Sequence, residues 1–314
     1  MQENDKLKIS CIVNPRSARN KWQRRKKLRS FLLKNLPGET IDIQGGKRDT
    51  IETTKKKCIH HDIIVAVGGD GTVADVIQGI VESGRGKEIF LGLIPFGSGN
   101  AFRKSLHIPK YVKKALNVLK KGNIITIDLI DVDGKAATFV SVGATAKVTQ
   151  EKLQHKAQGL LGHLLASRIM FTLPSNDLEI ELIEGTNNAG ECFESKVLHL
   201  KAFDCIIGKT NHFGYNWKIA PKAMIDDGFL DITFFEITGL KYFLYFPLIY
   251  FGIFQKRQKH FKARKMTIKG QHLPVQYNGE FLGVKDEIEL EVLPQALNVL
   301  SPKVGIREGS RLNI

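Results

Sequence analysis

The chain has 314 residues, of which 42% are hydrophobic, and its formal net charge is +15 at pH 7. This length and apolar content suffice for two domains with proper cores. No segment reaches the roughly 18–20 uninterrupted apolar residues that a membrane-spanning helix needs, so composition excludes one. The N-terminus has no signal or lipidation pattern, which predicts a cytoplasmic protein. The positive charge predicts an anionic partner, either a nucleic acid or an acidic membrane surface.

The first part of the chain alternates strand and helix patterns. Short, branched apolar runs predict buried parallel strands, which we expect near Lys8–Val13, Ile63–Val67 and Phe90–Ile94. Apolar residues at helical spacing predict helices, which we expect near Lys21–Asn35, Thr72–Ser83 and Val112–Lys121. A helix stop at Lys121-Gly122-Asn123 ends this pattern.

Two glycine-rich turns follow successive strands of this part, Gly68-Gly69-Asp70-Gly71-Thr72 and Gly97-Ser98-Gly99-Asn100. Glycine lets backbone N–H groups approach a ligand, and the helix after the first turn would point its N-terminus at an anion. Neither turn matches the P-loop or the dinucleotide fingerprint. Because both lie at the carboxyl edge of one sheet, they favour a nucleotide site. The acidic Asp70 within that site indicates a metal ion or a proton transfer.

From Ile124 onward the pattern is mostly that of β-strands. Leucine and isoleucine alternate with glutamate around Leu178–Leu182 and Ile288–Val292. Such alternation gives one buried and one wet face, which is typical of antiparallel sheets. The four cysteines have no paired or metal-ligand spacing, so we expect buried thiols in a reducing compartment. The order predicts an α/β nucleotide-binding domain followed by a β-rich domain.

Several segments, in order, resemble the diacylglycerol kinase catalytic family, which includes soluble bacterial diacylglycerol kinases, sphingosine kinases and ceramide kinases. They are Asn14-Pro15-Arg16-Ser17, Val67–Thr72, Ile94–Phe102, Pro221–Leu230 and Tyr277-Asn278-Gly279-Glu280. The resemblance implies an N-terminal three-layer α/β domain and a C-terminal antiparallel β-sandwich. The first would span residues 1–128 with a return at 293–314, and the second residues 129–292.

The resemblance implies an ATP-dependent lipid kinase, with ATP and Mg²⁺ as cofactors. Its acceptor would be a hydroxyl of diacylglycerol, a sphingoid base or a related lipid alcohol. An alternative is a kinase of a soluble substrate, because NAD kinases share the Gly-Gly-Asp-Gly turn. A basic nucleic-acid-binding protein is disfavoured, since no nucleic-acid motif is present and the positive charge is spread along the chain. A homodimer stays open.

The resemblance also implies the site residues. The nucleotide would be held by Asn14, Pro15, Arg16, Ser17, Ala18, Gly69, Gly71, Thr72, Ser98 and Asn100. A carboxylate must take the proton of the lipid hydroxyl. Glu280 is assigned as this base and Asp70 to Mg²⁺, with Asp128 as a supporting carboxylate; Asp70 as the base stays open.

A second metal ion is implied at the Asp226-Asp227-Gly228 segment. Its ligands would be Asp227 and the backbone carbonyls of Met224 and Phe229, a set of oxygen atoms that suits Mg²⁺ or Ca²⁺. The alternative is a plain Asp-Gly turn before a strand. The chain departs from the family pattern at Asn278, where the family has Asp, and in the stretch Val142-Gly143-Ala144-Thr145-Ala146, which lacks an acidic residue that some members carry there.

The segment Tyr242–Phe254 is rich in aromatic residues and runs into a basic stretch. It is too short to span a bilayer and is interrupted by Pro247. Six positive charges follow at Lys256, Arg257, Lys259, Lys262, Arg264 and Lys265. Each contributes about 1 kcal/mol at an anionic surface. This arrangement predicts reversible docking of the enzyme on an anionic membrane; an apolar helix packed on the β-rich domain is the alternative.

Overall fold

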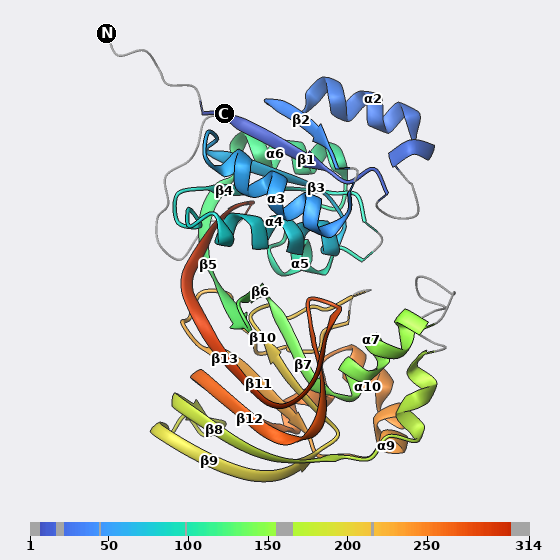
Figure 1. Ribbon diagram of the computed structural model, residues 1–314, viewed down its shortest axis with the longest axis vertical. Coiled ribbons are helices and arrows are strands. Elements are labelled where there is room, and N and C mark those ends of the chain that lie inside the picture. Colours follow the sequence, from blue (N-terminus) through green and yellow to red (C-terminus); the bar gives the residue numbers. More distant parts are fainter. Residues whose placement is uncertain are drawn as a thin grey trace. The chain divides into compact units, whose positions relative to one another are not determined.

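The protein is described by a computed structural model at residues 7–16, 22–43, 45–97, 99–154, 166–214 and 217–302 (Figure 1). The chain divides into two compact units. Unit 1 is residues 1–127 with 295–314, and unit 2 is residues 128–294. The chain therefore leaves unit 1 and returns to it near its C-terminus.

Unit 1 is built on a parallel sheet with the strand order β13-β4-β3-β1-β2. The first four strands in the chain are β1 (Ile9–Val13), β2 (Glu39–Asp42), β3 (Ile63–Gly68) and β4 (Phe90–Pro95). The prediction of three buried parallel strands is confirmed. The sequence did not predict β2, because it is only four residues long and none of them is buried.

Helices accompany these strands, as the alternating pattern predicted. They are α2 (Lys26–Asn35), α3 (Lys47–Cys58), α4 (Asp70–Glu82), α5 (Ala101–Ser105) and α6 (Val112–Lys121). The sequence did not predict α3, whose buried face consists of Thr50, Thr54 and Cys58 in place of aliphatic residues. Helix α3 packs closely on α4, because a Cβ atom on Gly79 would come within 2.8 Å of the Ile51 carbonyl oxygen.

The return of the chain to unit 1 is made by the end of β13 (Glu280–Ser301). Asn298 and Val299 of this strand pair in parallel with Phe90 and Leu91 of β4. The Asn298 side chain donates to the Lys87 carbonyl oxygen at 2.7 Å, and Ser301 Oγ donates to that of Leu106 at 3.0 Å. The end of β13 thus lies in the sheet of unit 1.

Unit 2 is an antiparallel, sandwich-like β domain centred on the long strand β12. This strand pairs antiparallel with β7, β8, β11 and β13. Besides β13, the strands are β5 (Asn123–Val132), β6 (Lys135–Ala137), β7 (Phe139–Gly143), β8 (Asn176–Asn187), β9 (Cys192–Ala202), β10 (Asp204–Gly208), β11 (Leu230–Phe235) and β12 (Lys259–Tyr277). Its helices are α7 (Ala144–Gln154), η1 (Ser167–Phe171), α9 (Gly239–Leu244), α10 (Phe246–Tyr250) and η2 (Phe254–Arg257).

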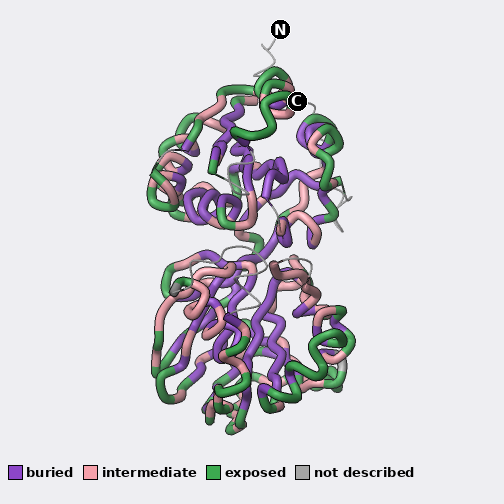
Figure 2. The backbone as a smooth tube through the Cα atoms, turned by 90° about the vertical axis from the view of Figure 1, so that its right-hand side faces the viewer, coloured by how far each residue is buried: buried purple, intermediate pink, exposed green. Residues whose placement is uncertain are grey.

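Some strands of unit 2 are buried on one face and others on both. Strand β8 alternates buried and more exposed residues, as its sequence predicted. Strands β7, β10 and β11 are buried throughout. Val140 and Val142 of β7 lie in the apolar core between the strands, whereas Phe139 packs in a second core with Tyr242 and Ile249. The buried residues form the purple interior of each unit in Figure 2.

The cysteines follow this burial only in part. Cys11, Cys58 and Cys205 are buried free thiols, whereas Cys192 at the start of β9 is exposed. The prediction of buried thiols is therefore wrong for Cys192. Burial, with a smaller contribution from Glu39, raises the pKa of the Cys11 thiol to about 12, which keeps it protonated and unreactive.

Candidate functional site

Asn14, directly after β1, ties the end of this strand to the end of β3 and to the start of α4. Its backbone N–H donates to the Val67 carbonyl oxygen at 3.1 Å, and its Nδ2 donates to Thr72 Oγ1 at 3.0 Å. Its Oδ1 accepts the backbone N–H of Arg16 at 3.0 Å. Arg16 is exposed, whereas Pro15 is buried. Asn14 thus holds the turn after β1 against the start of α4.

The two glycine turns of unit 1 touch through their backbones. A Cβ atom on Gly97 would come within 2.3 Å of Gly69 Cα, which no side chain could tolerate. The Gly97 N–H donates to the Gly68 carbonyl oxygen at 3.1 Å. A Cβ atom on Gly68 would lie 2.5 Å from Thr72 Oγ1. Glycine is required at these positions because the turns after β3 and β4 pack without side chains between them.

Asn100 closes the second turn. Its backbone is left-handed, with φ 53°, and its side chain bonds both polar groups of one residue. Oδ1 accepts the Gly97 N–H at 3.2 Å, and Nδ2 donates to the Gly97 carbonyl oxygen at 2.8 Å. Asn100, which the sequence predicted to bind the nucleotide, thus stabilises the second glycine turn. The predicted residues Ser17, Ala18 and Ser98 lie outside the described residues.

Asp70 is the first residue of α4 and faces the start of α5. Its Oδ1 accepts the backbone N–H of Phe102 at 3.3 Å. Burial raises the pKa of the Asp70 carboxyl, and the N–H groups of residues 100–102 and the charge of Lys104 oppose this rise. Burial also lowers the pKa of Lys104, with a further contribution from Arg103. Two basic side chains that the sequence did not single out therefore accompany Asp70.

The predicted base Glu280 belongs to unit 2, where it begins β13 after a tight turn. Asn278 and Gly279 of this turn both have positive φ. The Oδ1 of Asn278 accepts the Thr138 N–H at 2.9 Å, and its Nδ2 donates to the Ala136 carbonyl oxygen at 3.2 Å. An ionised aspartate could not make the second bond, since it has no N–H. Asn278 at this position therefore anchors the hairpin that carries Glu280.

The predicted metal ligands of unit 2 surround a lysine. Lys209, directly after β10, lies with its Nζ 2.7 Å from Asp227 Oδ1 and 2.6 Å from the Phe229 carbonyl oxygen. The same Nζ lies 3.0 Å from Asp128 Oδ2. Lys262 Nζ lies 2.6 Å from Asp227 Oδ2. Two of the three predicted ligand atoms, in Asp227 and Phe229, are thus in contact with an ammonium group.

Asp128, predicted as a supporting carboxylate, is buried with Lys209 and has structural partners. Its Oδ2 accepts the backbone N–H of Gly228 at 2.7 Å, and its own N–H donates to the Ile225 carbonyl oxygen at 2.7 Å. Its contacts tie β5 to the segment after Pro221. No group of three or more His, Cys, Asp or Glu side chains suited to a metal ion occurs within the described ranges.

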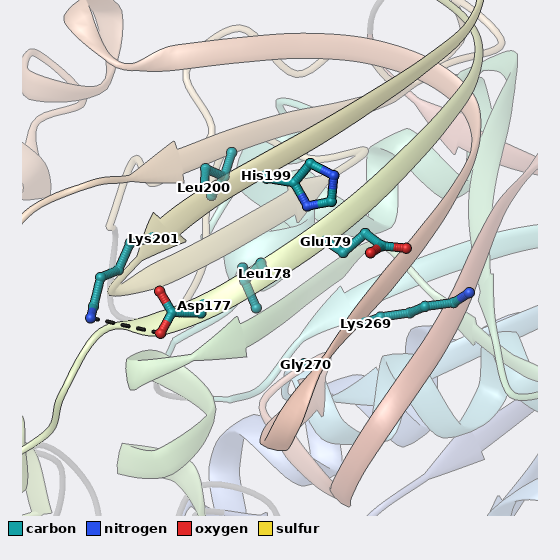
Figure 3. Close-up of a pocket in the computed structure, with 8 residues that line it drawn as sticks. All are labelled: Asp177, Leu178, Glu179, His199, Leu200, Lys201, Lys269 and Gly270. Atoms are coloured by element: carbon teal, nitrogen blue, oxygen red, sulfur yellow. Dashed lines mark ion pairs between the residues drawn. The ribbon is translucent and has the colours of Figure 1, made fainter.

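A pocket of about 560 Å³ lies on the strands of unit 2 (Figure 3). It is lined by Asp177, Leu178, Glu179, His199, Leu200, Lys201, Lys269 and Gly270. The Lys201 and Asp177 side chains that border it form an exposed ion pair at 3.7 Å. None of the predicted site residues lines this pocket, so it carries no part of the site described above.

Both units match known protein-family models. Residues 8–132 match the diacylglycerol kinase catalytic domain, and residues 138–301 match the YegS C-terminal NAD kinase beta sandwich-like domain. The chain belongs to the diacylglycerol kinase catalytic family. The first match corresponds to the α/β unit and the second to the β-sandwich-like unit.

The chain is similar to curated proteins named diacylglycerol kinase. The chain is 25% identical to one from Staphylococcus saprophyticus over 259 residues, which cover 77% of this chain and 80% of the relative. It is 25% identical to one from Staphylococcus aureus over 237 residues, covering 73% and 70%. A crystal structure of a diacylglycerol kinase from Bacillus anthracis superposes with a TM-score of 0.72. That structure is 21% identical and the match covers 95% of this chain and 98% of the other, which shows a shared fold.

Proposed function

We propose that this chain is an ATP-dependent kinase that transfers the γ-phosphoryl group of ATP to the hydroxyl of a lipid alcohol. Diacylglycerol, a sphingoid base and related lipid alcohols are the acceptor class. The observation that carries the proposal is the direct packing of the Gly69 and Gly97 turns beside the start of α4. Backbone without side chains at a helix N-terminus suits the phosphates of a nucleotide.

The nucleotide half of the site would be in unit 1. The first backbone bond of α4 runs from Val73 N–H to the Gly69 carbonyl oxygen, so the amides of Asp70 and Gly71 precede it at the helix end. The Asp70 carboxylate fits Mg²⁺, which prefers oxygen ligands and accompanies ATP. When bound, Mg²⁺ neutralises phosphate charge. Arg103 and Lys104 would add positive charge on the same side.

The proton acceptor would be a carboxylate, because a lipid hydroxyl is a weak nucleophile at neutral pH. We assign this role to Glu280, which is half-buried at the start of β13 and is held by the Asn278 anchor. Asp70 is the alternative base. The two roles predict different mutant kinetics. Loss of a base lowers turnover, whereas loss of a metal-binding carboxylate also weakens nucleotide affinity.

The lipid half of the site would use an apolar surface on α9 and α10. We define this surface by apolar side chains that are 42–65% exposed, namely Leu240, Phe243, Leu244, Leu248, Phe251 and Ile253. Tyr242 and Ile249 of the same helices are buried and hold them on the domain. Exposed apolar clusters of this kind mark membrane or ligand surfaces. No described helix is both long and apolar enough to cross a bilayer.

The basic stretch after this surface is less available than its sequence predicted. Most of it is part of β12, where acidic side chains partner the positive charges. The ion pairs are Lys259–Glu236 at 2.9 Å, Lys262–Asp227 at 2.6 Å, Arg264–Glu184 at 3.0 Å and Lys265–Glu289 at 3.0 Å. We therefore propose that the apolar surface contributes more to membrane docking than the basic stretch does, with Lys241 and Arg257 exposed nearby.

One experiment tests the activity. Purified protein is incubated with γ-labelled ATP and Mg²⁺, with a panel of diacylglycerol, sphingoid base and ceramide in mixed micelles, and separately with NAD. Label in a lipid phosphate, separated by chromatography, is expected. Label in NAD without label in any lipid would instead favour a kinase of a soluble substrate. The second matched domain is described as NAD kinase beta sandwich-like, which is why NAD is included.

A second experiment tests the apolar surface. Binding to anionic vesicles is expected to weaken when Phe243, Leu244 and Phe251 are changed together to Ser. The matched control changes two apolar residues exposed elsewhere, Ile59 and Val197, to Ser. Equal binding by the α9–α10 variant and wild type would contradict the proposal.

A further inference from the structure

Lys209 is a fully buried lysine in the interior of unit 2. Its ammonium group has three N–H bonds, and three oxygen atoms surround it at 2.6, 2.7 and 3.0 Å, those of Phe229, Asp227 and Asp128. Each N–H bond therefore has one acceptor. Lysine is almost never fully buried unless its charge is compensated. The segment around Asp227 therefore surrounds the Lys209 ammonium group with oxygen atoms, as it would surround a bound metal ion.

Two lysines and two aspartates form direct ion pairs here: Lys209 contacts Asp128 and Asp227, and Lys262 contacts Asp227. Asp231 adds a further buried carboxylate near Lys262. Both oxygen atoms of the Asp227 carboxylate contact an ammonium group: Oδ1 that of Lys209 at 2.7 Å and Oδ2 that of Lys262 at 2.6 Å. The Phe229 N–H also donates to Oδ1 at 3.3 Å.

The backbone of the same segment is fixed around this cluster. The Gly228 N–H donates to Asp128 Oδ2 at 2.7 Å, and the Met224 N–H donates to Asp231 Oδ2 at 3.0 Å. Asp231 in turn contacts His260 Nε2 at 3.0 Å. Lys209 joins three segments: the middle of β5, the residues after β10 and the loop 221–229.

A divalent cation does not fit beside this ammonium. Mg²⁺ or Ca²⁺ binds oxygen at roughly 2.0–2.6 Å. A cation bound to Asp227 Oδ1 and to the Phe229 carbonyl oxygen would need the two atoms that Lys209 Nζ already contacts at 2.7 and 2.6 Å, and it would lie next to a positive charge. The ligand set implied by the family resemblance is thus incompatible with a metal ion unless Lys209 leaves.

We propose that Lys209 is a built-in cation that takes the place of a divalent metal ion in this loop, so that unit 2 folds without Mg²⁺ or Ca²⁺. The proposal does not rest on the kinase activity. A covalently attached ammonium is always present, whereas a bound metal stabilises a protein only at concentrations above its dissociation constant.

The test measures thermal unfolding of the full chain without ATP, in EDTA and in millimolar MgCl₂ or CaCl₂. Wild type is expected to melt at the same temperature in all three. Lys209→Ala is expected to melt lower in EDTA by roughly 5–15 °C, since it leaves buried carboxylates uncompensated. Because Lys209→Ala also leaves an ion-sized space, divalent cations are expected to restore part of the lost melting temperature. This variant is expected to bind one Mn²⁺ ion per chain.

Two further variants make the result specific. Lys209→Met removes the charge but fills the space, so it is expected to melt lower without recovery by metal. Lys259→Ala removes a lysine of an exposed ion pair and is expected to behave as wild type. If neither Lys209 variant folds, the wild-type measurement decides alone. Two results would overturn the proposal. One is a melting temperature that rises with Mg²⁺ in wild type and rises equally in Asp70→Asn. The other is a Lys209→Ala protein that no divalent cation stabilises.

Discussion

Gly97 and Gly69 meet with no room for a side chain: a Cβ atom on Gly97 would lie 2.3 Å from Gly69 Cα. The ends of β3 and β4 are held together by this contact. Gly97→Ala is expected to lower the free energy of unfolding by about 1–3 kcal/mol, because the turns must move apart. Urea unfolding measures the loss. Stability equal to that of wild type would show that the turns are not in contact.

Gly71 provides the opposite case in the same turn. A Cβ atom there meets nothing within 4 Å, and Gly71 lies in the first turn of α4. Gly71→Ala is therefore expected to leave the melting temperature unchanged and to raise the KM for ATP, because a methyl group would keep phosphates from the backbone. An unchanged KM would mean that phosphates do not approach this turn.

The strands and turns of unit 1 were largely predictable from sequence, and the reason is local. The runs around Ile63–Gly68 and the apolar spacing of α4 are strong periodic signals. The helix α3 was missed because threonine fills its buried face. In unit 2, β10 and β11 are mostly apolar and buried throughout although they are antiparallel, because the second core around Tyr242 covers their other face. A continuous apolar run alone therefore cannot identify a parallel strand.

The candidate site was predictable only where a motif is continuous in sequence. Asp70 and Glu280 come from such motifs. Lys209 does not, because its partners Asp128 and Asp227 come from separate segments and no local pattern connects them. A lone lysine after the apolar run Cys205–Gly208 was the available signal. The ion pairs of β12 were missed for the same reason, since the acids lie on other strands and loops.

Asn278 is expected to be sensitive to the residue that the family pattern carries. Asn278→Asp removes the N–H bond to the Ala136 carbonyl oxygen and places a negative charge in the turn. A loss of about 1–3 kcal/mol in the free energy of unfolding is expected. Asn298→Asp is the matched control, because its Nδ2 bond to Lys87 is exposed and should cost less. Equal losses in both variants would contradict the anchoring role.

Asp204 predicts a pH dependence of stability. This carboxyl is fully buried beside the Thr145 hydroxyl and N–H, and burial raises its pKa to about 8. Since the pKa of the unfolded state is about 4, the folded state binds the proton more tightly between about pH 4 and about pH 8. Stability should therefore fall as pH rises through this window, with the whole penalty present above about pH 8.

The measurement is urea unfolding at about pH 5 and about pH 8, a range within which the Asp204 effect develops. Asp204→Asn cannot lose a proton, so its stability is expected to change less than that of wild type between the two conditions. Buried Cys205 and Tyr242 lie beside Asp204, and burial raises the pKa of both groups well above their usual values, so they stay neutral. The same pH dependence in both proteins would assign the effect to another group.

Glu280→Gln tests the proton acceptor. Removing a general base lowers turnover by roughly 10²- to 10⁴-fold, so kcat should fall by that amount while the KM for ATP changes little. The side chain keeps its size and the melting temperature should not change. A near-normal kcat would remove Glu280 from the mechanism and leave Asp70 as the base.

The central claim is that this chain phosphorylates a lipid by means of the site around Asp70. Transfer of label from γ-labelled ATP to lipid in mixed micelles tests it most directly, with wild type and Asp70→Asn compared under the same conditions. The account predicts labelled lipid phosphate from wild type and a loss of several orders of magnitude in Asp70→Asn at an unchanged melting temperature. Absence of labelled lipid with wild type, or equal labelling by both proteins, would contradict it.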